Sequence, residues 1–280
     1  MKATSVVTKK IEEKSGNINI YQTKSSSSDL VTSIDHWSEK EIIKLIKELR
    51  PNDQILAEEG TQISGKSNVK WIIDPIDGTT NFVYGHPGFS VSVGAEINNE
   101  TAAGSISVPL LGENFKADTK NGAYRNNQPI QVNNSKNLDT SLISTGFSYD
   151  PVKRKKQAEG LTHIIPKIRD IRRTGGAAFD LASVACGRVD GFFESGLSPW
   201  DISAGHALVN SAGGKIMTIT PPNKNSSKSP KIETMKSATE VSEDMITVAA
   251  SKELIEKLVE LIVESQFYNN KNNLNKNKLL

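Results

Sequence analysis

Residues 71–82 read WIIDPIDGTTNF, and this stretch decides how the rest of the chain is interpreted. Its apolar start is typical of a buried strand, and two aspartates, Asp74 and Asp77, follow directly, three positions apart. Pro75 fixes φ and offers no N–H group, and the turn that it favours directs the carbonyl oxygen of Ile76 and the carboxylate of Asp77 to the side of Asp74. The stretch therefore predicts a strand that ends in a cluster of oxygen ligands.

The residues after Asp77 point to an anion. Gly78 lets a ligand approach the backbone closely, and residues 79–81 are expected to begin a helix whose free N–H groups can bind a negative group. Cation ligands beside an anion-binding helix start indicate phosphate chemistry. A single aspartate at a strand end is more often a turn or helix cap than a ligand, so the spacing alone leaves that alternative open.

Carboxylates follow predicted strands at two further places. Glu58 and Glu59 come directly after the strand predicted at residues 54–57, and Asp201 follows a short loop after the strand predicted at residues 188–194. Oxygen-rich sites of this kind suit hard cations such as magnesium or manganese, which prefer carboxylate, carbonyl and water to thiolate or imidazole.

Length and composition limit the classes of function. The 280 residues suffice for one large domain or two closely packed ones, and the net charge of +2 gives no argument for nucleic acid or an acidic membrane surface. The single cysteine, Cys186, excludes an internal disulfide framework and a multi-cysteine zinc site, and it suits a reducing compartment. No apolar run approaches the roughly 20 residues of a membrane span. We expect a cytoplasmic protein.

The first half of the chain is predicted to combine a helix with a mostly antiparallel sheet. Ser38 and Glu41 have the spacing of a capping box, and Pro51 is expected to stop the helix that they begin. The predicted helix covers residues 38–50, and the predicted strands cover 54–57, 69–73, 89–97 and 102–108, of which the last two are expected to pair.

The second half is predicted to be α/β. Strands are expected at residues 141–147, 188–194 and 245–251, and helices at 177–186, from Asp201 to the glycine pair at 213–214, and at 254–263. Residues 221–239 are rich in Ser, Lys, Asn and Pro and are predicted to form a solvated insertion. The Asn/Lys-rich end of the chain is predicted to be disordered.

Taken together, these motifs resemble those of the inositol monophosphatase family of magnesium-dependent, lithium-sensitive phosphatases. WIIDPIDGTTNF is similar to the family's first signature, WDISAGHALVNSAGG at 200–214 to its second, and AEEG at 57–60 also fits. IRRTGG and GRVDGFFESGLSPWD look most like the bacterial inositol-1-monophosphatase branch, and DGTTNF in place of DGTKEF argues against the nucleotide bisphosphate phosphatase branch. The resemblance runs from residue 24 to residue 214, about two thirds of the chain.

The resemblance implies a layered α/β fold, the five-layer αβαβα sandwich of the inositol monophosphatase and fructose bisphosphatase type. Residues 1–138 would form an N-terminal α+β half that carries Glu58 and the DPIDGT site. Residues 139–266 would form a C-terminal α/β half that carries Glu194 and Asp201, and residues 267–280 a disordered tail. Relatives extend further upstream, and their connection at 221–239 is shorter, so we expect these departures to affect stability and specificity more than catalysis.

The resemblance also implies two or three Mg²⁺ ions per active site. Glu58, Asp74 and the Ile76 carbonyl would bind the first ion, Asp74, Asp77 and Asp201 the second, and Glu58 would assist a weaker third. Glu59 would have a structural role or would contact the metal ligands without binding a metal itself. The implied catalytic residues are Glu58, Thr79 and Asp35, with Asp35 orienting Thr79 so that its hydroxyl helps to activate a metal-bound water.

For the substrate, the resemblance implies contacts from both halves of the chain. Glu194 would accept hydrogen bonds from polyol hydroxyls, and Arg173 is either a further contact or half of a solvated arginine pair. Lys24 belongs either to a lid over the site or to a flexible linker. The implied substrate-binding residues are Ile76, Asp77, Gly78, Thr79, Arg173, Gly175, Gly176, Ala177, Glu194 and Asp201.

The predicted reaction is hydrolysis of a phosphate monoester, with inositol-1-phosphate as the first choice. Histidinol phosphatase and fructose bisphosphatase activities on the same scaffold stay open as alternatives. The resemblance further implies a homodimer, no membrane association and no binding of nucleic acid. Bacterial relatives also act as accessory factors for ribosomal RNA transcription, so an association with RNA polymerase is the alternative from another class of function.

Overall fold

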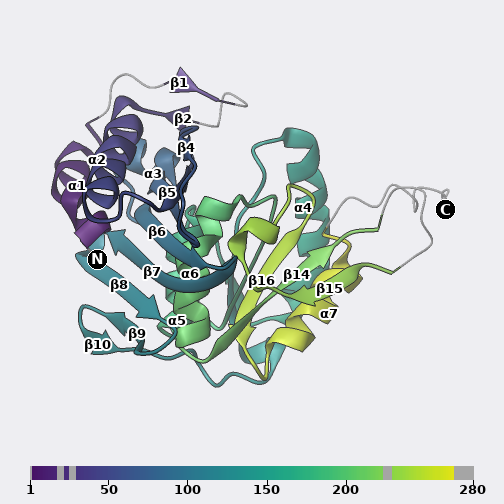
Figure 1. Cartoon of the computed structure of the whole chain (residues 1–280). Helices are drawn as coiled ribbons and strands as arrows, with labels where there is room; N and C mark the ends of the chain where they lie inside the picture. The colour runs from purple at the N-terminus through teal and green to yellow at the C-terminus, as the bar shows by residue number, and fades with distance from the viewer. Residues whose placement is uncertain (1, 18–21, 25–29, 223–228, 268–280) are drawn as a thin grey trace, which may run out of the picture.

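The computed structural model describes residues 2–17, 22–24, 30–222 and 229–267 (Figure 1). Both the serine-rich run at 25–28 and all of the predicted disordered tail except Phe267 lie outside these residues. The α-helices are α1 (Lys2–Lys14), α2 (Ser33–Leu49), α3 (Thr79–Tyr84), α4 (Pro151–Ile164), α5 (Ala177–Ala185), α6 (Pro199–Ser211) and α7 (Ile255–Ser265). Short 3₁₀ helices are η1 (Pro109–Leu111), η2 (Leu138–Thr140), η3 (Ile165–Lys167) and η4 (Ala238–Glu240).

Two large sheets organise the chain. The eight-stranded sheet has the order β10-β9-β8-β7-β6-β5-β3-β4, and only β3 and β5 pair in parallel. Its strands are β3 (Gln54–Ala57), β4 (Gln62–Ile63), β5 (Val69–Asp77), β6 (Ser90–Ile97), β7 (Glu100–Val108), β8 (Glu113–Asp118), β9 (Gly122–Arg125) and β10 (Gln128–Pro129). The predicted, mostly antiparallel sheet of the first half is therefore confirmed, as is the pairing of its two long strands.

The second sheet is mixed. Its order is β12-β11-β13-β16-β14-β15, and β11 runs parallel to both β12 and β13. The strands are β11 (Leu142–Thr145), β12 (Asp170–Arg172), β13 (Gly191–Ser195), β14 (Gly214–Thr220), β15 (Lys231–Thr234) and β16 (Ile246–Ser251). A separate two-stranded ladder pairs β1 (Gln22–Thr23) with β2 (Leu30–Val31).

Helices and sheets alternate in five layers (Figure 1). Helices α1 and α2 cover one face of the eight-stranded sheet, and α5 and α6 lie between that sheet and the six-stranded one. Helices α4 and α7 pack together on the far side of the six-stranded sheet, where α7 contacts β14 and β16. The predicted layered α/β fold is confirmed.

The middle layer is built from small side chains. All nine residues of α5 are buried, because sheets enclose this helix on both sides. At α6 the fit is so close that a Cβ atom on Gly94 would overlap the side chain of Ser203, and one on Gly104 would overlap the backbone of Ala204. Helices α5 and α6 contact both sheets, so these contacts do not separate the chain into two halves at residue 138. The division into an N-terminal and a C-terminal half remains our proposal.

Strand β5 continues past its predicted end at residue 73. It reaches Asp77, which pairs with Ser90 of β6, and the register of the ladder shifts between Asp74 and Asp77. This irregularity is what a proline inside a strand requires, since Pro75 has no N–H to donate. Residues 71–77 of the opening stretch are thus a bulged strand end, and α3 begins at Thr79, directly after Gly78.

The predicted start of the first long helix is wrong. Helix α2 begins at Ser33, and its capping box joins Thr32 to Asp35 in place of Ser38 to Glu41. Ser38 lies inside the helix, where its hydroxyl donates to the carbonyl oxygen of Pro75 at 3.2 Å. The apolar pattern placed the start too late, because Ile34 in the first turn is already buried and Asp35 beside it is a buried polar residue that contacts Thr79.

The prediction of a solvated insertion at residues 221–239 is wrong for Met235, Ser237 and Ala238, which are buried. Residues 223–228 lie outside the described residues, and β15, which pairs with β14, is exposed along its whole length. The buried carboxylate of Glu96 accepts hydrogen bonds from the Ser237 hydroxyl at 2.6 Å and the Ala238 N–H at 2.8 Å. Ser237 and Ala238 therefore pack against β6 of the eight-stranded sheet and are not solvated.

Two other boundaries differ. Strand β13 begins at Gly191 and not at residue 188, and α6 begins at Pro199, so Asp201 lies in its first turn. Among the described helices, none combines the length and the apolar character that a membrane span needs.

Candidate active site

Three carboxylates meet where the two halves of the chain face each other. Asp74 and Asp77 come from the end of β5, and Asp201 comes from the first turn of α6. Each offers an oxygen within 4.8 Å of the oxygens of the other two. The sequence separation between Asp77 and Asp201 is bridged by the fold, because α6 packs against β5 and β6.

The donors around each carboxylate fix its orientation. Asp77 accepts hydrogen bonds from the N–H groups of Ala177 and Ala178 at 3.1 and 3.0 Å, and from the hydroxyl of Ser90 at 3.2 Å. The N-terminus of α5 thus points at Asp77, as helix starts do toward negative groups. Asp201 accepts the N–H of Ser198 at 2.7 Å as part of its own capping box.

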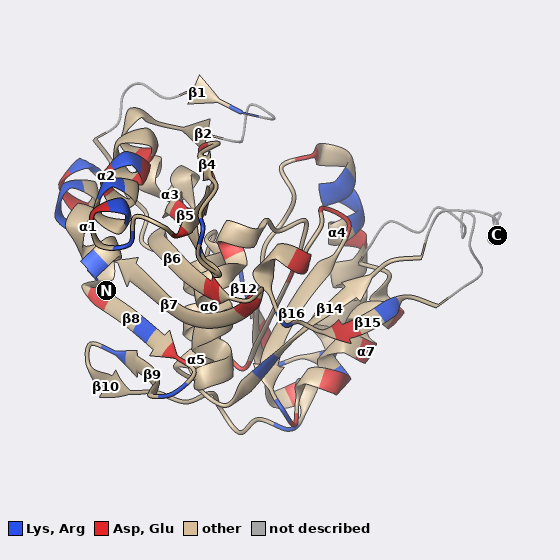
Figure 2. Ribbon diagram, viewed as in Figure 1, with Lys and Arg blue, Asp and Glu red and all other residues tan. Residues whose placement is uncertain are grey.

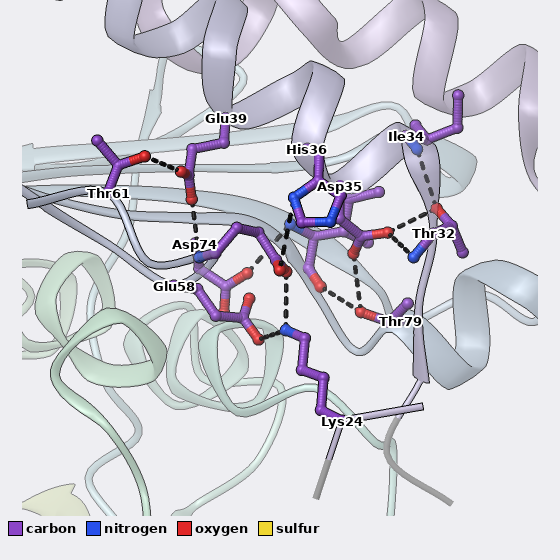
Figure 3. A network of polar contacts seen from close by, with 12 residues as sticks. Lys24, Thr32, Ile34, Asp35, His36, Glu39, Glu58, Thr61, Asp74 and Thr79 are labelled. Atoms are coloured by element: carbon purple, nitrogen blue, oxygen red, sulfur yellow. Dashed lines mark hydrogen bonds and ion pairs between the residues drawn. The ribbon is translucent and has the colours of Figure 1, made fainter. Parts of the chain in front are cut away.

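A fourth carboxylate, Glu58, follows β3 and meets a lysine (Figure 3). The Nζ atom of Lys24 lies 2.9 Å from Oε1 of Glu58 and 2.7 Å from Oε1 of Glu59. The Oε2 atom of Glu58 is buried and receives no hydrogen bond of normal geometry from any described residue. Lys24 therefore balances part of the negative charge, and one oxygen of Glu58 stays open toward the cluster.

Thr79 and Asp35 form a second polar unit beside the carboxylates (Figure 3). The Thr79 hydroxyl donates to Oδ1 of Asp35 at 3.0 Å and lies 3.1 Å from the Ile76 carbonyl oxygen. Asp35 is fully buried, and its other oxygen accepts the N–H and the hydroxyl of Thr32 at 2.8 and 2.6 Å. The cap of α2 thus holds the carboxylate that orients Thr79.

The electrostatics of the cluster favour the protonated acids. Burial raises the pKa of Glu58 to about 7 and that of Asp77 to about 6. Burial, followed by the charges of the neighbouring carboxylates, raises the pKa of Asp74 and Asp201 well above the usual range. Figure 2 shows acidic residues between the two sheets, whereas many Lys and Arg residues lie on α1, α2 and α4.

This donor set fits a hard divalent cation. Every candidate ligand atom is an oxygen. Asp74 and Asp77 are buried, Asp201 and Glu58 are half-buried, and one oxygen of Glu58 has no donor among the described residues. The negative charges of these carboxylates repel one another. A cation would neutralise these charges at once, which is how magnesium and manganese sites are built. The Ile76 carbonyl belongs to the same bulge and lines the same cleft.

A cleft of about 480 Å³ opens above the cluster. Its far wall carries Glu194 at the end of β13, and a Cβ atom on Gly146 would overlap the Glu194 carboxyl group. Only glycine lets this carboxyl group lie against the backbone there. Burial raises the pKa of Glu194 well above its usual range, with the charge of Asp180 as the next cause.

The turn before α5 forms another part of the wall. Arg173, Gly175 and Ala177 line the cleft, and the Arg173 guanidinium lies 6.0 Å from the Phe147 ring. Gly176 fits tightly, because a Cβ atom there would lie 2.7 Å from Oδ2 of Asp77. By contrast, Arg172 points elsewhere and pairs with Asp170.

The structure brings together all of the residues that the sequence singled out. The cleft is lined by Glu58, Asp74, Ile76, Asp77, Gly78, Thr79, Arg173, Gly175, Ala177, Glu194 and Asp201. Asp35 and Gly176 lie directly behind that lining. Sequence reasoning missed Ser90, Gly146 and Asp180. Only Ser90 carried a signal, as the polar residue that begins a strand beside Asp77.

Comparison with known proteins gives a consistent result. The profile of the Inositol monophosphatase family matches residues 1–266. The Inositol-1-monophosphatase of Synechocystis is 43% identical over 206 residues, 72% of this chain and 71% of its own. The Nus factor SuhB of Haemophilus influenzae is 40% identical over 217 residues, 77% of this chain and 80% of its own.

Solved structures agree in their fold. The extragenic suppressor protein suhB of Bartonella henselae superposes with a TM-score of 0.80 at 30% identity, over 93% of this chain and 95% of its own. An IMPase of Thermotoga maritima gives a TM-score of 0.77 at 32% identity, over 94% and 95% of the two chains. By sequence and by fold, this chain belongs to the inositol monophosphatase family.

Proposed function

We propose that the chain is a magnesium-dependent, lithium-sensitive phosphatase that hydrolyses a phosphate monoester, with inositol-1-phosphate as its first substrate. The observation that carries this proposal is the oxygen-only cluster of buried Asp74 and Asp77 with half-buried Asp201, beside Glu58. Such a cluster is costly to the fold unless a cation compensates it, so a purely structural role would not explain it.

Two or three Mg²⁺ ions would be held by Glu58, Asp74, the Ile76 carbonyl, Asp77 and Asp201. When bound, they would lower the pKa of a water and neutralise negative charge on the phosphate and the leaving oxygen. Asp77 is the most firmly oriented of these ligands, because three donors hold its two oxygens. Lys24 would release Glu58 as a cation arrives, since both compete for the same carboxylate.

Thr79 is the residue that would handle the proton of the attacking water. Its hydroxyl hydrogen is directed at Asp35, so the lone pairs of its oxygen are left to accept a hydrogen bond from the water. Asp35 cannot turn away, because Thr32 holds its other oxygen through two hydrogen bonds. The pair therefore orients the water and takes up part of its proton's charge.

The phosphate and the polyol of the substrate would contact different parts of the cleft. The N–H groups at Gly78 and Thr79 are candidates for the phosphate oxygens, as expected at a helix start. Glu194 would accept hydrogen bonds from polyol hydroxyls, and Arg173 would contact the same group from the turn before α5. We also propose that Gly175, Gly176 and Ala177 supply the backbone surface against which the polyol ring lies.

A substrate panel with the purified protein tests this function. We expect phosphate release from inositol-1-phosphate that requires magnesium, falls with lithium and has the highest kcat/KM of the panel. Histidinol phosphate and fructose 1,6-bisphosphate are the comparison substrates for the two alternative activities. If magnesium does not stimulate release from any of the three, the proposal is wrong.

A second candidate function is an accessory role in ribosomal RNA transcription, through binding to RNA polymerase. Its support is the 40% identity to the Nus factor SuhB of Haemophilus influenzae. Capture of RNA polymerase by the wild type and by Asp77→Asn would show whether binding depends on the cleft. Equal capture by both would make the two roles separable, and no capture by either would exclude this candidate.

We further propose that the chain forms a homodimer. Light scattering on the purified protein gives the mass directly, and a monomer at micromolar concentration would contradict the proposal.

A further inference from the structure

Three unpaired polar atoms lie together behind the wall of the cleft. Among the described residues, the buried side-chain atoms without a hydrogen bond of normal geometry include Oδ1 of Asp180, Oγ of Ser144 and Oγ1 of Thr174. Burial raises the pKa of the Asp180 carboxyl group to about 7, and the hydroxyls of Thr174 and Ser144 lie close enough to oppose this rise. The three atoms therefore form one polar site, which we call the Asp180 node.

The node joins three separate segments of the chain. Ser144 belongs to β11, Thr174 to the turn before α5, and Asp180 to α5 itself. Ser144 is fully buried, and Asp180 is 1% exposed. Buried polar groups without partners are rare in folded proteins and usually mark a bound water or a functional constraint. A buried water bonds to two to four polar groups, and the node offers three.

The turn next to the node is tightly confined. The carbonyl oxygen of Thr174 accepts a hydrogen bond from Nδ2 of Asn81 at 2.8 Å. A Cβ atom on Gly78 would lie 2.9 Å from the Gly175 carbonyl oxygen, and Gly175 itself has φ +99°. A shift of this turn would therefore move Arg173 and Gly175 in the cleft wall.

Asp180 also acts electrostatically on the residues that face the polyol. After burial, its negative charge is the largest cause of the raised pKa of Glu194, and Arg173 lowers the pKa of both acids. Asp180 does not line the cleft, so it acts on the polyol through Glu194 and Arg173, and its charge also acts on Asp77.

We propose that Asp180 is a positioning residue: through a buried water shared with Ser144 and Thr174, it fixes the turn that carries Arg173 and sets the wall that receives the polyol. This inference rests on the proposed function, because it assumes that the wall binds the alcohol half of the substrate. It concerns the binding of that half and changes no ligand of the metal cluster.

The first test is a crystal structure of the wild type at a resolution that shows ordered waters. We expect a water within hydrogen-bond distance of Oδ1 of Asp180 and of the hydroxyls of Ser144 and Thr174. If no ordered water lies between these three side chains, the proposed shared water is wrong. This result does not depend on which substrate the protein hydrolyses.

The second test separates KM from kcat. Thr174→Val keeps the shape of the side chain and removes the hydroxyl, so we expect KM for inositol-1-phosphate to rise about fivefold to tenfold, the loss expected for one buried hydrogen bond. With 4-nitrophenyl phosphate, whose alcohol has no further hydroxyl, we expect kcat and KM to change by less than about twofold. Thr174→Ser should restore the wild-type KM.

Asp180→Asn removes the charge while keeping the shape, and we expect the same selective rise in KM. Thr218→Val is the matched control, because Thr218 is a buried threonine of β14 outside the cleft lining. Equal losses with both substrates, or no loss with either, would overturn the positioning role. If the wild type hydrolyses neither ester, the proposed function fails. In that case, crystal structures of Thr174→Val and the wild type still test the inference. Residues 173–176 should be displaced in the variant, and an unchanged turn would contradict the positioning role.

Discussion

At the scale of the residue, the carboxylates of the cleft differ in how firmly they are held. Asp77 receives three hydrogen bonds and Asp201 receives one from the backbone, whereas Oε2 of Glu58 receives none from the described residues. Hydrogen bonds to an ionised carboxylate both orient it and favour its charge. Asp77 is thus built as a fixed ligand, and Glu58 as one that can adapt.

The first prediction concerns Asp77→Asn. The amide NH₂ group would face backbone N–H groups that need an acceptor, so the variant loses both a charged ligand and its orientation. We expect magnesium-dependent phosphatase activity to fall at least about 100-fold, more than the loss that follows from changing a residue behind a ligand. Initial rates across a magnesium titration measure this.

The control for this variant is Asp118→Asn, which changes an aspartate of β8 that does not line the cleft. Its activity should equal that of the wild type. Full activity of Asp77→Asn at saturating magnesium would remove Asp77 from the ligand set.

The second prediction concerns Gly146→Ala. The added Cβ atom would overlap the Glu194 carboxyl group, so this group must move from its place in the wall. We expect KM for inositol-1-phosphate to rise about tenfold with little change in kcat, as for a lost substrate hydrogen bond.

A double-mutant cycle with Glu194→Ala is the matched control for Gly146→Ala. Once the carboxyl group is removed, the extra methyl group has nothing to displace, so its effect on KM should disappear. Independent, multiplicative effects of the two changes would contradict the contact.

At the scale of the element, the start of α2 serves both the helix and the site. Thr32 caps the helix, and the same hydrogen bonds hold Asp35, which in turn orients Thr79. Several residue types can cap a helix start. Here Asp35 both completes the capping box of Thr32 and accepts the hydrogen bond of Thr79. The cap is therefore part of the proposed catalytic unit.

The third prediction concerns Thr32→Ala. Loss of an N-cap costs about 1 kcal/mol, which lowers the unfolding temperature of a chain of this size by roughly 2–4 °C. Because Asp35 also loses the hydrogen bond from the Thr32 hydroxyl and keeps only the one from the backbone N–H, kcat should fall as well. Thr32→Ser should restore both quantities, and calorimetry with initial-rate kinetics measures them. Loss of stability without loss of kcat would separate the cap from catalysis.

At the scale of the whole molecule, the cluster makes the fold depend on pH and on metal. The carboxyl pKa values of Glu58 and Asp77 are raised in the folded state, so between about pH 4 and pH 7 the folded protein binds more protons than the unfolded chain. The contribution of these acids to the free energy of unfolding therefore decreases as pH rises through that window.

The fourth prediction follows from this sign. With the metal chelated, unfolding temperatures should be lower at pH 7.5 than at pH 5.5, and added magnesium should stabilise the protein mainly at the higher pH. Asp74→Asn removes one of the repelling charges, so its chelated form should lose less stability between the two pH values. Equal pH dependence in wild type and variant would show that the cluster does not control the effect.

The sequence by itself determined the main ligand residues of the site, but not most of the residues that surround them. WIIDPIDGTTNF contains a strand end, two ligands and a helix start within twelve residues, so local geometry alone brings Asp74 and Asp77 together. Helical and strand periodicity likewise predicted most of the elements, because both are short-range properties of the chain. The beginning of α2 was mispredicted because Ser38 and Glu41, inside the helix, have the same spacing as the true capping pair, Thr32 and Asp35.

What only the tertiary structure decided is which distant residues share the cleft. Asp201 reaches Asp77 because α6 packs on β5 and β6, and Glu194 lies in the wall because Gly146 leaves room for it. No local pattern predicts the Asp180 node or the hydrogen bonds to Glu96, since Ser144 lies far along the chain from Asp180, and Ser237 from Glu96. Sequence periodicity reports which face of an element is buried, whereas packing between layers determines what that face meets.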